Sequence, residues 1–425
     1  MTGGQSVPDR SDLIRQIERA NRIAWPWILV QIGLSVSLAV AIDWRAVVAS
    51  PWFSLFVVAV IVGPHVMALL KHWVQNKKEI DDLKERTRFG EFDKHRLRGL
   101  VNDTLHRLNL PPPGPPVYIT ADKTLNAGAI NLGSGGVFRS LNGVYLNRQV
   151  LHRLTAEEVQ DIIGHELGHY YRYYLVNQRC EGLTLLLGAL AGLLVTQWIG
   201  LSDIFGMIAL TGCGAASWYV SGKLYAGNAE AIEYLCDDFG AHVHGVAVSI
   251  NGLLKIGVDS EIQLAVHQQE LLARRHKNLT ARDIIEAIEA AVPYGHATQA
   301  ELEAAVEQSL KRQSEKRRTL TPMGFFEHAW LGDDDDGELE AEMLKVKRLQ
   351  KLPRLDWERL LDEPGRIDLD EAQIEELVEL LETYPEYVLF RLPGEVGGGD
   401  GVHPPMRNRI LYLWKNRREI ESGRD

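Results

Sequence analysis

Four long stretches without a charged residue restrict what this chain can fold into. They cover residues 24–42, 52–70, 183–202 and 204–222, and each is long enough to cross a bilayer as a helix. The second pair is rich in small residues, which allow close helix packing in lipid: Gly188, Gly192, Gly206, Gly212 and Gly214. We therefore expect four membrane spans. The alternative for the second pair is a buried helical hairpin within a soluble core.

Basic residues near the ends of these stretches predict how the chain sits in the membrane. Arg10, Arg15, Arg19 and Arg22 precede the first stretch, and only Arg45 lies between the first and the second. Cytoplasmic flanks of membrane spans are enriched in lysine and arginine. We expect a multi-pass protein of the cell (inner) membrane with both termini and the segment between the second and third stretches in the cytoplasm. The three cysteines lack metal-ligand spacing and fit a reducing compartment.

A His-Glu-Leu-Gly-His run that starts at His165 lies between the two pairs of apolar stretches. Thr155 and Glu158 form a capping-box pattern at the start of this segment, and apolar residues then recur at helical spacing. On a helix, His165 and His169 share one face and can bind one ion, while Glu166 can reach a water at that ion. This arrangement is typical of zinc peptidases, which need a third protein ligand. The alternative is an ordinary amphipathic helix with two solvated histidines.

The third ligand is expected in the helical segment after the last apolar stretch. Glu233 is the best candidate, because Asp237 lies one turn later and can accept the second ring N–H of a ligand histidine. Glu230 is the rival, since it lies three residues earlier on a similar face. A solvated acidic face is the remaining alternative in a chain with 57 acidic residues. His242 and His244 are expected to be structural or solvated rather than ligands.

These motifs, in this order, resemble the HtpX-type integral-membrane zinc metallopeptidases, which are relatives of the CAAX prenyl proteases. The segment from Glu233 to Asp237 departs from the usual family pattern only by Cys236 in place of Ala. His403, followed by two prolines, and Arg409 resemble the family's closing His-Pro motif, whose His and Arg lie at the active site. The resemblance also covers an Asn-Ala edge strand at residues Asn126, Ala127, Gly128, Ala129 and Ile130.

The resemblance implies an α+β fold, with a helical membrane anchor and a mostly α zinc-metallopeptidase domain that carries a small β-sheet. It implies one Zn²⁺ per chain, held by His165, His169 and Glu233, which would lower the pKa of a water and polarise the scissile carbonyl. Glu166 would be the general base. His403 is the expected donor to the oxyanion, and the substrate is expected to add as a strand along the Asn-Ala edge.

The expected domain organisation has six segments. They are a tail with two spans (1–74), the first part of the catalytic domain with the zinc helix (75–182), the second pair of spans (183–222), the Glu helix (223–258), a helical insertion (259–398) and the closing His-Pro segment (399–425). The insertion matches nothing in the family pattern, and we expect it to regulate access or to contact partners. The charged linker at 71–92 is expected to be helical, and strands are expected at 117–120 and 143–147.

The net charge of −11, without a large basic stripe, argues against nucleic acid as a partner. We expect a zinc metalloendopeptidase of the EC 3.4.24 type that cleaves membrane or membrane-proximal proteins on the cytoplasmic side, in protein quality control. One alternative is a prenyl-protein-type processing protease, which would need a large chamber among many more spans. The other is a catalytically silent zinc-containing membrane scaffold, against which the intact Glu166 argues.

Overall fold

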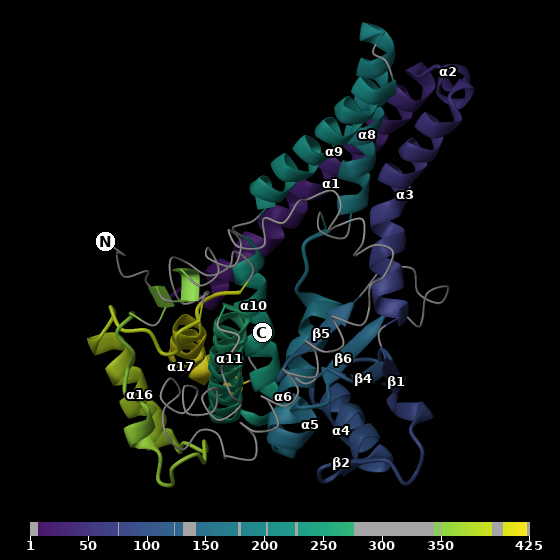
Figure 1. The fold of residues 1–425 in the computed structure, drawn as a ribbon. Coiled ribbons are helices and arrows are strands. Elements are labelled where there is room, and N and C mark those ends of the chain that lie inside the picture. The colour runs from purple at the N-terminus through teal and green to yellow at the C-terminus, as the bar shows by residue number, and fades with distance from the viewer. Residues whose placement is uncertain are drawn as a thin grey trace.

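The computed structural model has the predicted α+β fold, in which helices predominate and four strands form a small mixed sheet (Figure 1). The described part of the chain comprises residues 7–74, 76–122, 124–130, 142–176, 180–200, 203–225, 228–275, 344–346, 348–349, 351–392 and 403–422. Long helices project from one end of the molecule, and the sheet and the remaining helices form a compact domain at the other end (Figure 1).

Four helices project from the compact domain, and we call them the apolar bundle: α1 (Arg10–Ala41), α3 (Pro51–Val74), α8 (Glu181–Ile199) and α9 (Asp203–Tyr225). Among the described residues, α1, α8 and α9 contain segments long and apolar enough to cross a membrane. The apolar stretch found in α3 is Pro51–Gly63, which is shorter, so the second expected span stays a prediction. Many large apolar side chains of the bundle are exposed, as lipid-facing side chains would be. The bundle therefore supports membrane association.

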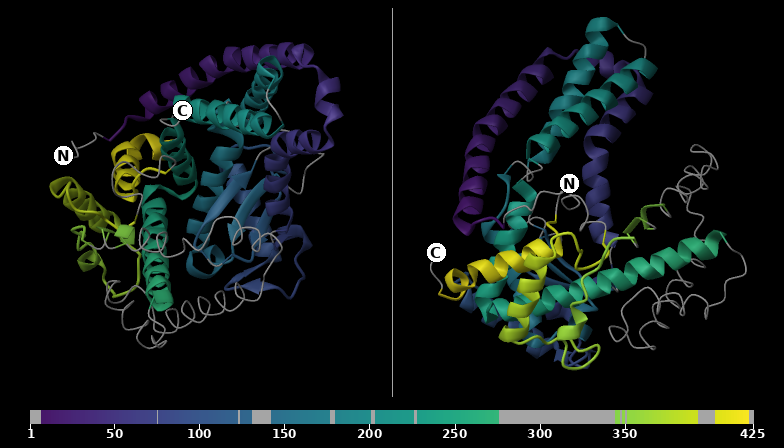
Figure 2. Two further views of the ribbon diagram at one scale, coloured as in Figure 1. Left: turned by 45° about the horizontal axis from the view of Figure 1, so that its top comes forward. Right: turned by 90° about the vertical axis from the view of Figure 1, so that its left-hand side faces the viewer.

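The hairpin of α8 and α9 lies between α1 and α3 and packs through glycine (Figure 2). A Cβ on Gly192 would lie 2.5 Å from Cα of Leu210, and one on Gly188 would lie 2.6 Å from the carbonyl oxygen of Cys213. The expected close packing is thus present at these two glycines. It is absent at Gly212, where a Cβ would meet no atom within 4 Å.

The sheet has the strand order β1–β4–β6–β5, formed by Lys77–Glu79, Val117–Thr120, Gly143–Asn147 and Ala127–Ile130. β4 and β6 are parallel and occupy the positions predicted for strands, and the other two pairs are antiparallel. Among the described strands, β5 pairs only with β6. It is therefore an edge strand, as the resemblance implied.

The prediction of a helical linker at 71–92 is wrong. α3 continues to Val74, and after β1 the chain forms a 3-10 turn, η1 (Ile80–Asp82), and two short paired strands, β2 (Arg88–Phe89) and β3 (Phe92–Asp93). The charged composition favours a helix only locally, whereas β1 gains backbone hydrogen bonds by adding to the edge of β4. Tertiary pairing therefore overrides local propensity here.

The helices of the compact domain surround one hydrophobic core. They are α4 (Lys94–Arg107), α5 (Val150–Arg153), α6 (Ala156–Leu167), η3 (Gly168–Arg172), α10 (Ala229–His244), α11 (Val246–Arg275), η5 (Glu358–Leu360), α16 (Glu371–Thr383) and α17 (Met406–Ser422). α10 contacts α6, α11, α17 and the first turns of α1. Leu13 and Ile17 of α1 belong to this core, so α1 begins in the compact domain and only later enters the bundle.

The described end of the expected insertion at 259–398 is built into the core. α11 crosses the expected boundary without a break, and Figure 2 shows it as a long helix that extends beyond the domain. Trp357 and Phe390 are fully buried, and a Cβ on Gly257 of α11 would overlap the Phe390 ring. Asn251 binds both the backbone N–H and the carbonyl of Leu369. Residues 351–392 therefore pack as part of the hydrophobic core of the compact domain. Residues 276–343 lie outside the described residues.

Candidate metal centre

α6 and α10 approach each other until their backbones touch, and this contact positions every group of the candidate site. A Cβ on Gly240 of α10 would lie 2.7 Å from the carbonyl oxygen of Asp161. On α6, a Cβ on Gly164 would lie 3.0 Å from Cα of Gly240. A Cβ on Gly168 would lie 3.1 Å from Sγ of Cys236. A larger residue at Gly240 would force the two helices apart, so the short interhelical distance depends on these small residues.

The two motif histidines come from the end of α6 and the turn that follows it. The capping box of Thr155 and Glu158 starts α6 as predicted. α6 ends at Leu167, and the chain continues as a π turn, η3, that carries His169. The second histidine thus lies in a wider turn than the expected regular helix, and such π turns are frequent at functional sites.

The nitrogen and oxygen atoms of three side chains converge at this place. Nε2 of His165 lies 3.1 Å from Nε2 of His169. The carboxylate of Glu233 lies 3.7 Å from Nε2 of His165 and 3.3 Å from Nε2 of His169. Donor atoms bound to one tetrahedral zinc ion lie roughly 3.3–3.5 Å apart. Among the described residues these three form the group able to hold a metal ion, and their spacing fits zinc.

Asp237 fixes the ring of the first histidine. Its Oδ1 accepts from Nδ1 of His165 at 2.9 Å, which leaves the lone pair of Nε2 directed at the other ligand atoms. Arg409 of α17 donates from Nε to Oδ2 of Asp237 at 2.6 Å and from Nη2 to Oδ1. Burial raises the pKa of Asp237, but the charge and hydrogen bonds of Arg409 outweigh burial and hold that pKa below its ordinary value. The expected carboxylate partner is therefore in place and ionised.

Glu166 lies on α6 directly after His165 and is buried. Burial raises the pKa of its carboxyl, and the neighbouring His165 and His169 partly offset that effect. A raised pKa brings a carboxylate closer to the range in which it can both accept and return a proton near neutral pH.

The structure also places the remaining candidates. Nδ1 of His403 lies 3.0 Å from Oε2 of Glu233, so this exposed side chain adjoins the site although residues 393–402 before it are outside the described part. Glu230 is not in the ligand group, in contrast to Glu233 three residues later. His242 binds Asp238, and His244 binds Gln160, so neither histidine joins the group.

The residues proposed to bind a substrate form the edge strand β5 with the residue before it. β5 packs beside α6 and η3, the two elements that carry the histidines. Asn126 is exposed, Ala127 to Ile130 are half-buried, and a Cβ on Gly128 would meet no atom within 4 Å. Among the described strands, the outer edge of β5 has no partner, so this edge runs unpaired next to the ligand group with room above Gly128.

Two groups at this site were missed in the sequence. Gly240 and its role in the α6–α10 contact carry no motif, and only its place on the α10 face opposite Gly164 of α6 could have suggested it. Arg10 was considered only as a membrane-flanking charge, but it is buried and bonds Asp238, which also binds His242. No local signal in the sequence pairs residues 228 positions apart.

Comparison with known proteins is consistent with this geometry. Residues 91–273 match the model of peptidase family M48. This segment contains His165, Glu166, His169, Glu233 and Asp237, and the chain therefore carries an M48 peptidase domain. The match confirms the resemblance to HtpX-type and CAAX-type metallopeptidases. No curated protein and no solved structure matches the chain.

A peptidase domain of this family, joined to helices able to cross a membrane, supports a membrane-associated metallopeptidase.

Proposed function

We propose that this protein is a zinc-dependent endopeptidase that cleaves membrane or membrane-proximal proteins. The observation that carries the proposal is the convergence of His165, His169 and Glu233 at separations that suit one tetrahedral zinc ion. Asp237 supports it, because it holds His165 in the tautomer that a metal ligand requires. One zinc ion per chain would occupy this place.

When bound, zinc would supply a Lewis acid that activates water and polarises the scissile carbonyl. Glu166 would accept a proton from the attacking water and return it to the leaving amine. His403, beside Glu233, is the candidate for a hydrogen bond to the developing oxyanion. Arg409 acts through Asp237 and is a positioning residue.

The substrate would bind as an extended strand along β5. Backbone groups of Ala127 to Ile130 can pair with an added strand, because β5 has a partner on only one side among the described strands. The open space at Gly128 leaves room for a substrate side chain. Pairing through the backbone is largely independent of sequence, which suits an enzyme that acts on many damaged proteins rather than on one.

The apolar bundle favours substrates that are themselves in or near the membrane. Because the basic residues flank the spans on the side of the compact domain, that domain would lie in the cytoplasm, with the chain crossing the cell membrane several times. Quality control of membrane proteins is the biological role that we infer. A prenyl-protein-type protease and a silent zinc scaffold remain the alternatives, and they are separated by the experiment below.

The decisive variant is Glu166→Gln, which removes a base and leaves the three ligands intact. We expect bound zinc to be unchanged and kcat on casein and on a reconstituted membrane protein to fall by about 10²–10⁴-fold. Glu157→Gln is the matched control, because Glu157 is exposed in the first turn of the same helix. If the wild-type protein binds zinc but cleaves neither substrate, the result would favour the scaffold. Cleavage restricted to prenylated peptides would favour the processing enzyme.

A second test separates the two candidate acidic ligands. Glu233→Ala should lower zinc affinity far more than Glu230→Ala, because only Glu233 lies within the ligand group. Isothermal titration with Zn²⁺ after chelation measures both affinities. A larger loss in Glu230→Ala would contradict the assignment.

A further inference from the structure

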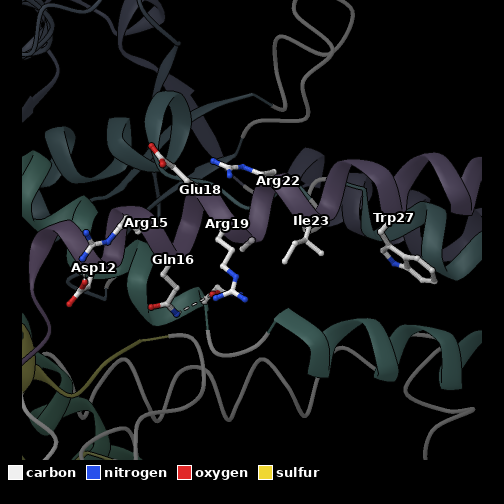
Figure 3. A pocket seen from close by; sticks show the side chains of 10 residues that line it. Asp12, Arg15, Gln16, Glu18, Arg19, Arg22, Ile23 and Trp27 are labelled. Carbon is white, nitrogen blue, oxygen red and sulfur yellow. Dashed lines mark hydrogen bonds and ion pairs between the residues drawn. The ribbon is translucent and has the colours of Figure 1, made fainter.

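A cavity of about 1170 Å³ lies at the start of α1. Its wall is formed by the face of α1 between Asp12 and Trp27 and by Asn228, the residue that precedes α10. The side chain of Gln16 donates to Asn228 at 3.0 Å and closes one end (Figure 3). The cavity therefore lies where α1 leaves the compact domain and enters the apolar bundle.

The polar part of this cavity is positively charged. Arg15, Arg19 and Arg22 line it and are exposed. Arg15 is paired with Asp12, whereas Arg19 has no ion-pair partner among the described residues. In Figure 3, Arg19 points to the same side of α1 as Gln16, Ile23 and Trp27, while Glu18 and Arg22 leave the other side. Asp12 and Glu18 also line the cavity, so its three arginines outnumber its two carboxylates.

The other part of the cavity is apolar and belongs to the expected membrane interface. Ile23 and Trp27 follow Arg19 at helical spacing and line the same wall (Figure 3). The Trp27 ring is half-buried, and its Nε1–H has no hydrogen-bond acceptor among the described residues. Tryptophan is enriched at the level of lipid headgroups, where its ring is in an apolar layer and its N–H meets polar atoms. A cation, an unpaired N–H donor and an apolar wall therefore follow one another along the helix.

We propose that this cavity binds an anionic phospholipid, with the headgroup phosphate at Arg19 and an acyl chain along Ile23 and Trp27. A free phosphate ion would use the arginine but gain nothing from the apolar wall. A neutral or zwitterionic lipid would use the wall but would gain less from an unpaired guanidinium. Basic pockets at the cytoplasmic ends of spans are known to suit anionic headgroups. The proposal rests on membrane association and is independent of peptidase activity.

The test measures lipid binding to the full chain in the Glu166→Gln background, so that self-cleavage does not interfere. Native mass spectrometry of detergent-purified protein compares phosphatidylglycerol with phosphatidylcholine of the same chain length. We expect a preference for phosphatidylglycerol that Arg19→Gln reduces by about tenfold or more, since one charge-assisted hydrogen bond is lost. Trp27→Phe should reduce it by a few-fold, because only the N–H is removed.

Arg418→Gln is the matched control, because it removes the same charge from an exposed arginine of α17 that is outside the cavity lining. It should change the preference by less than about threefold. Equal losses in Arg19→Gln and Arg418→Gln would show a diffuse surface charge and overturn the site. No preference for phosphatidylglycerol in the parent protein would also overturn it. Inorganic phosphate that competes with phosphatidylglycerol at millimolar concentration would show an anion site without lipid selectivity.

Discussion

Two helix pairs in this molecule are held together by glycine, and only one of them forms a chemical site. In the α8–α9 hairpin, Gly188 and Gly192 bring two backbones together among buried leucines. In the α6–α10 pair, Gly164 and Gly240 do the same, but the flanking positions are His, Glu and Asp. Close approach is therefore a packing device in both pairs. What differs is the chemistry that each pair brings within bonding distance.

The α6–α10 pair has an additional requirement, because it places charges in a low-dielectric interior. Two of the buried charges there are compensated by partners from a third element: Arg409 of α17 for Asp237, and Arg10 of α1 for Asp238. Burial of an unpaired charge would cost several kcal/mol. The α8–α9 pair needs no such partners, since its described contacts are apolar side chains and a hydrogen bond from Ser217 to the carbonyl of Thr184.

The largest effect is expected when Arg409 of α17 no longer pairs with Asp237 of α10. Arg409→Gln should destabilise the protein by about 3–5 kcal/mol, because Asp237 is left as a buried charge without its partner. It should also weaken zinc binding by about 10–100-fold, because His165 loses its orienting carboxylate geometry. Arg409→Lys should fall between wild type and Arg409→Gln, since lysine keeps the charge but not the two-pronged contact. Thermal unfolding and zinc titration measure the two effects, and unchanged values in Arg409→Gln would refute the coupling.

The α6–α10 pair is also expected to make the stability of the protein depend on pH, because α6 carries the buried Asp161. Burial raises the pKa of Asp161 on α6 to about 7. Ser249 donates a hydrogen bond to this carboxyl, which lowers the pKa, whereas the charge of Asp237 raises it further. The folded state therefore keeps a proton that the unfolded state releases above about pH 4. Stability should fall as pH rises from about 4 to 7, by up to about 4 kcal/mol, and then level off.

Asp161→Asn is the variant that isolates this contribution, because asparagine still accepts from Ser249 and does not ionise. The difference in unfolding free energy between metal-free wild type and Asp161→Asn should follow that pH window. Parallel pH profiles for the two proteins would mean that Asp161 ionises normally in the folded state.

Wedging the α6–α10 pair apart should have a smaller effect on stability. Gly240→Ala places a Cβ 2.7 Å from a backbone oxygen, so it should cost about 1–3 kcal/mol and weaken zinc binding, since Glu233 and the histidines move apart. Gly99→Ala is the control, because Gly99 lies inside α4 with no atom within 4 Å of the added Cβ. That variant should gain roughly 0.5–1 kcal/mol. A stabilising Gly240→Ala would show that the helices can yield at no cost.

The smallest effect on the metal centre is expected from the same substitution in the other pair. Gly192→Ala places a Cβ 2.5 Å from Cα of Leu210, so it should lower the thermal stability of the bundle but leave zinc affinity within about twofold of wild type. Gly212→Ala should do neither, because its Cβ meets open space. Zinc loss in Gly192→Ala would show that the bundle and the metal centre form one cooperative unit.

The sequence predicted the parts of this structure that depend on local spacing. The capping box, the strands β4 and β6, the apolar helices and the five residues from His165 to His169 are all local patterns, and the structure contains them. Glu233 and Asp237 could be named because one turn of helix relates them. Their distances from the histidines could not be predicted, since those distances depend on how α6 crosses α10.

Other features depend on contacts between distant residues and left no local signal. β1 is charged, and only its pairing with β4 makes it a strand. The segment 351–392 looked like an insertion because it matches no family pattern, yet Trp357 and Phe390 are buried in the shared core. The buried ion pair of Arg10 could not be predicted either, since a membrane-flanking arginine and a buried ion-pair partner look the same in sequence.

The order in which the chain is synthesised has a consequence for when the metal centre can exist. His165 and Asp237 are separated by 72 positions, and the whole α8–α9 hairpin lies between them. Arg409, which neutralises Asp237, is made another 172 positions later. The ribosome therefore delivers the first ligands long before the last charge partner, and the hairpin must fold back before His165 can meet Glu233. Until Arg409 is made, Asp237 lacks the partner that compensates its buried charge, so the α6–α10 pair gains its full stability only after the C-terminal helix has emerged.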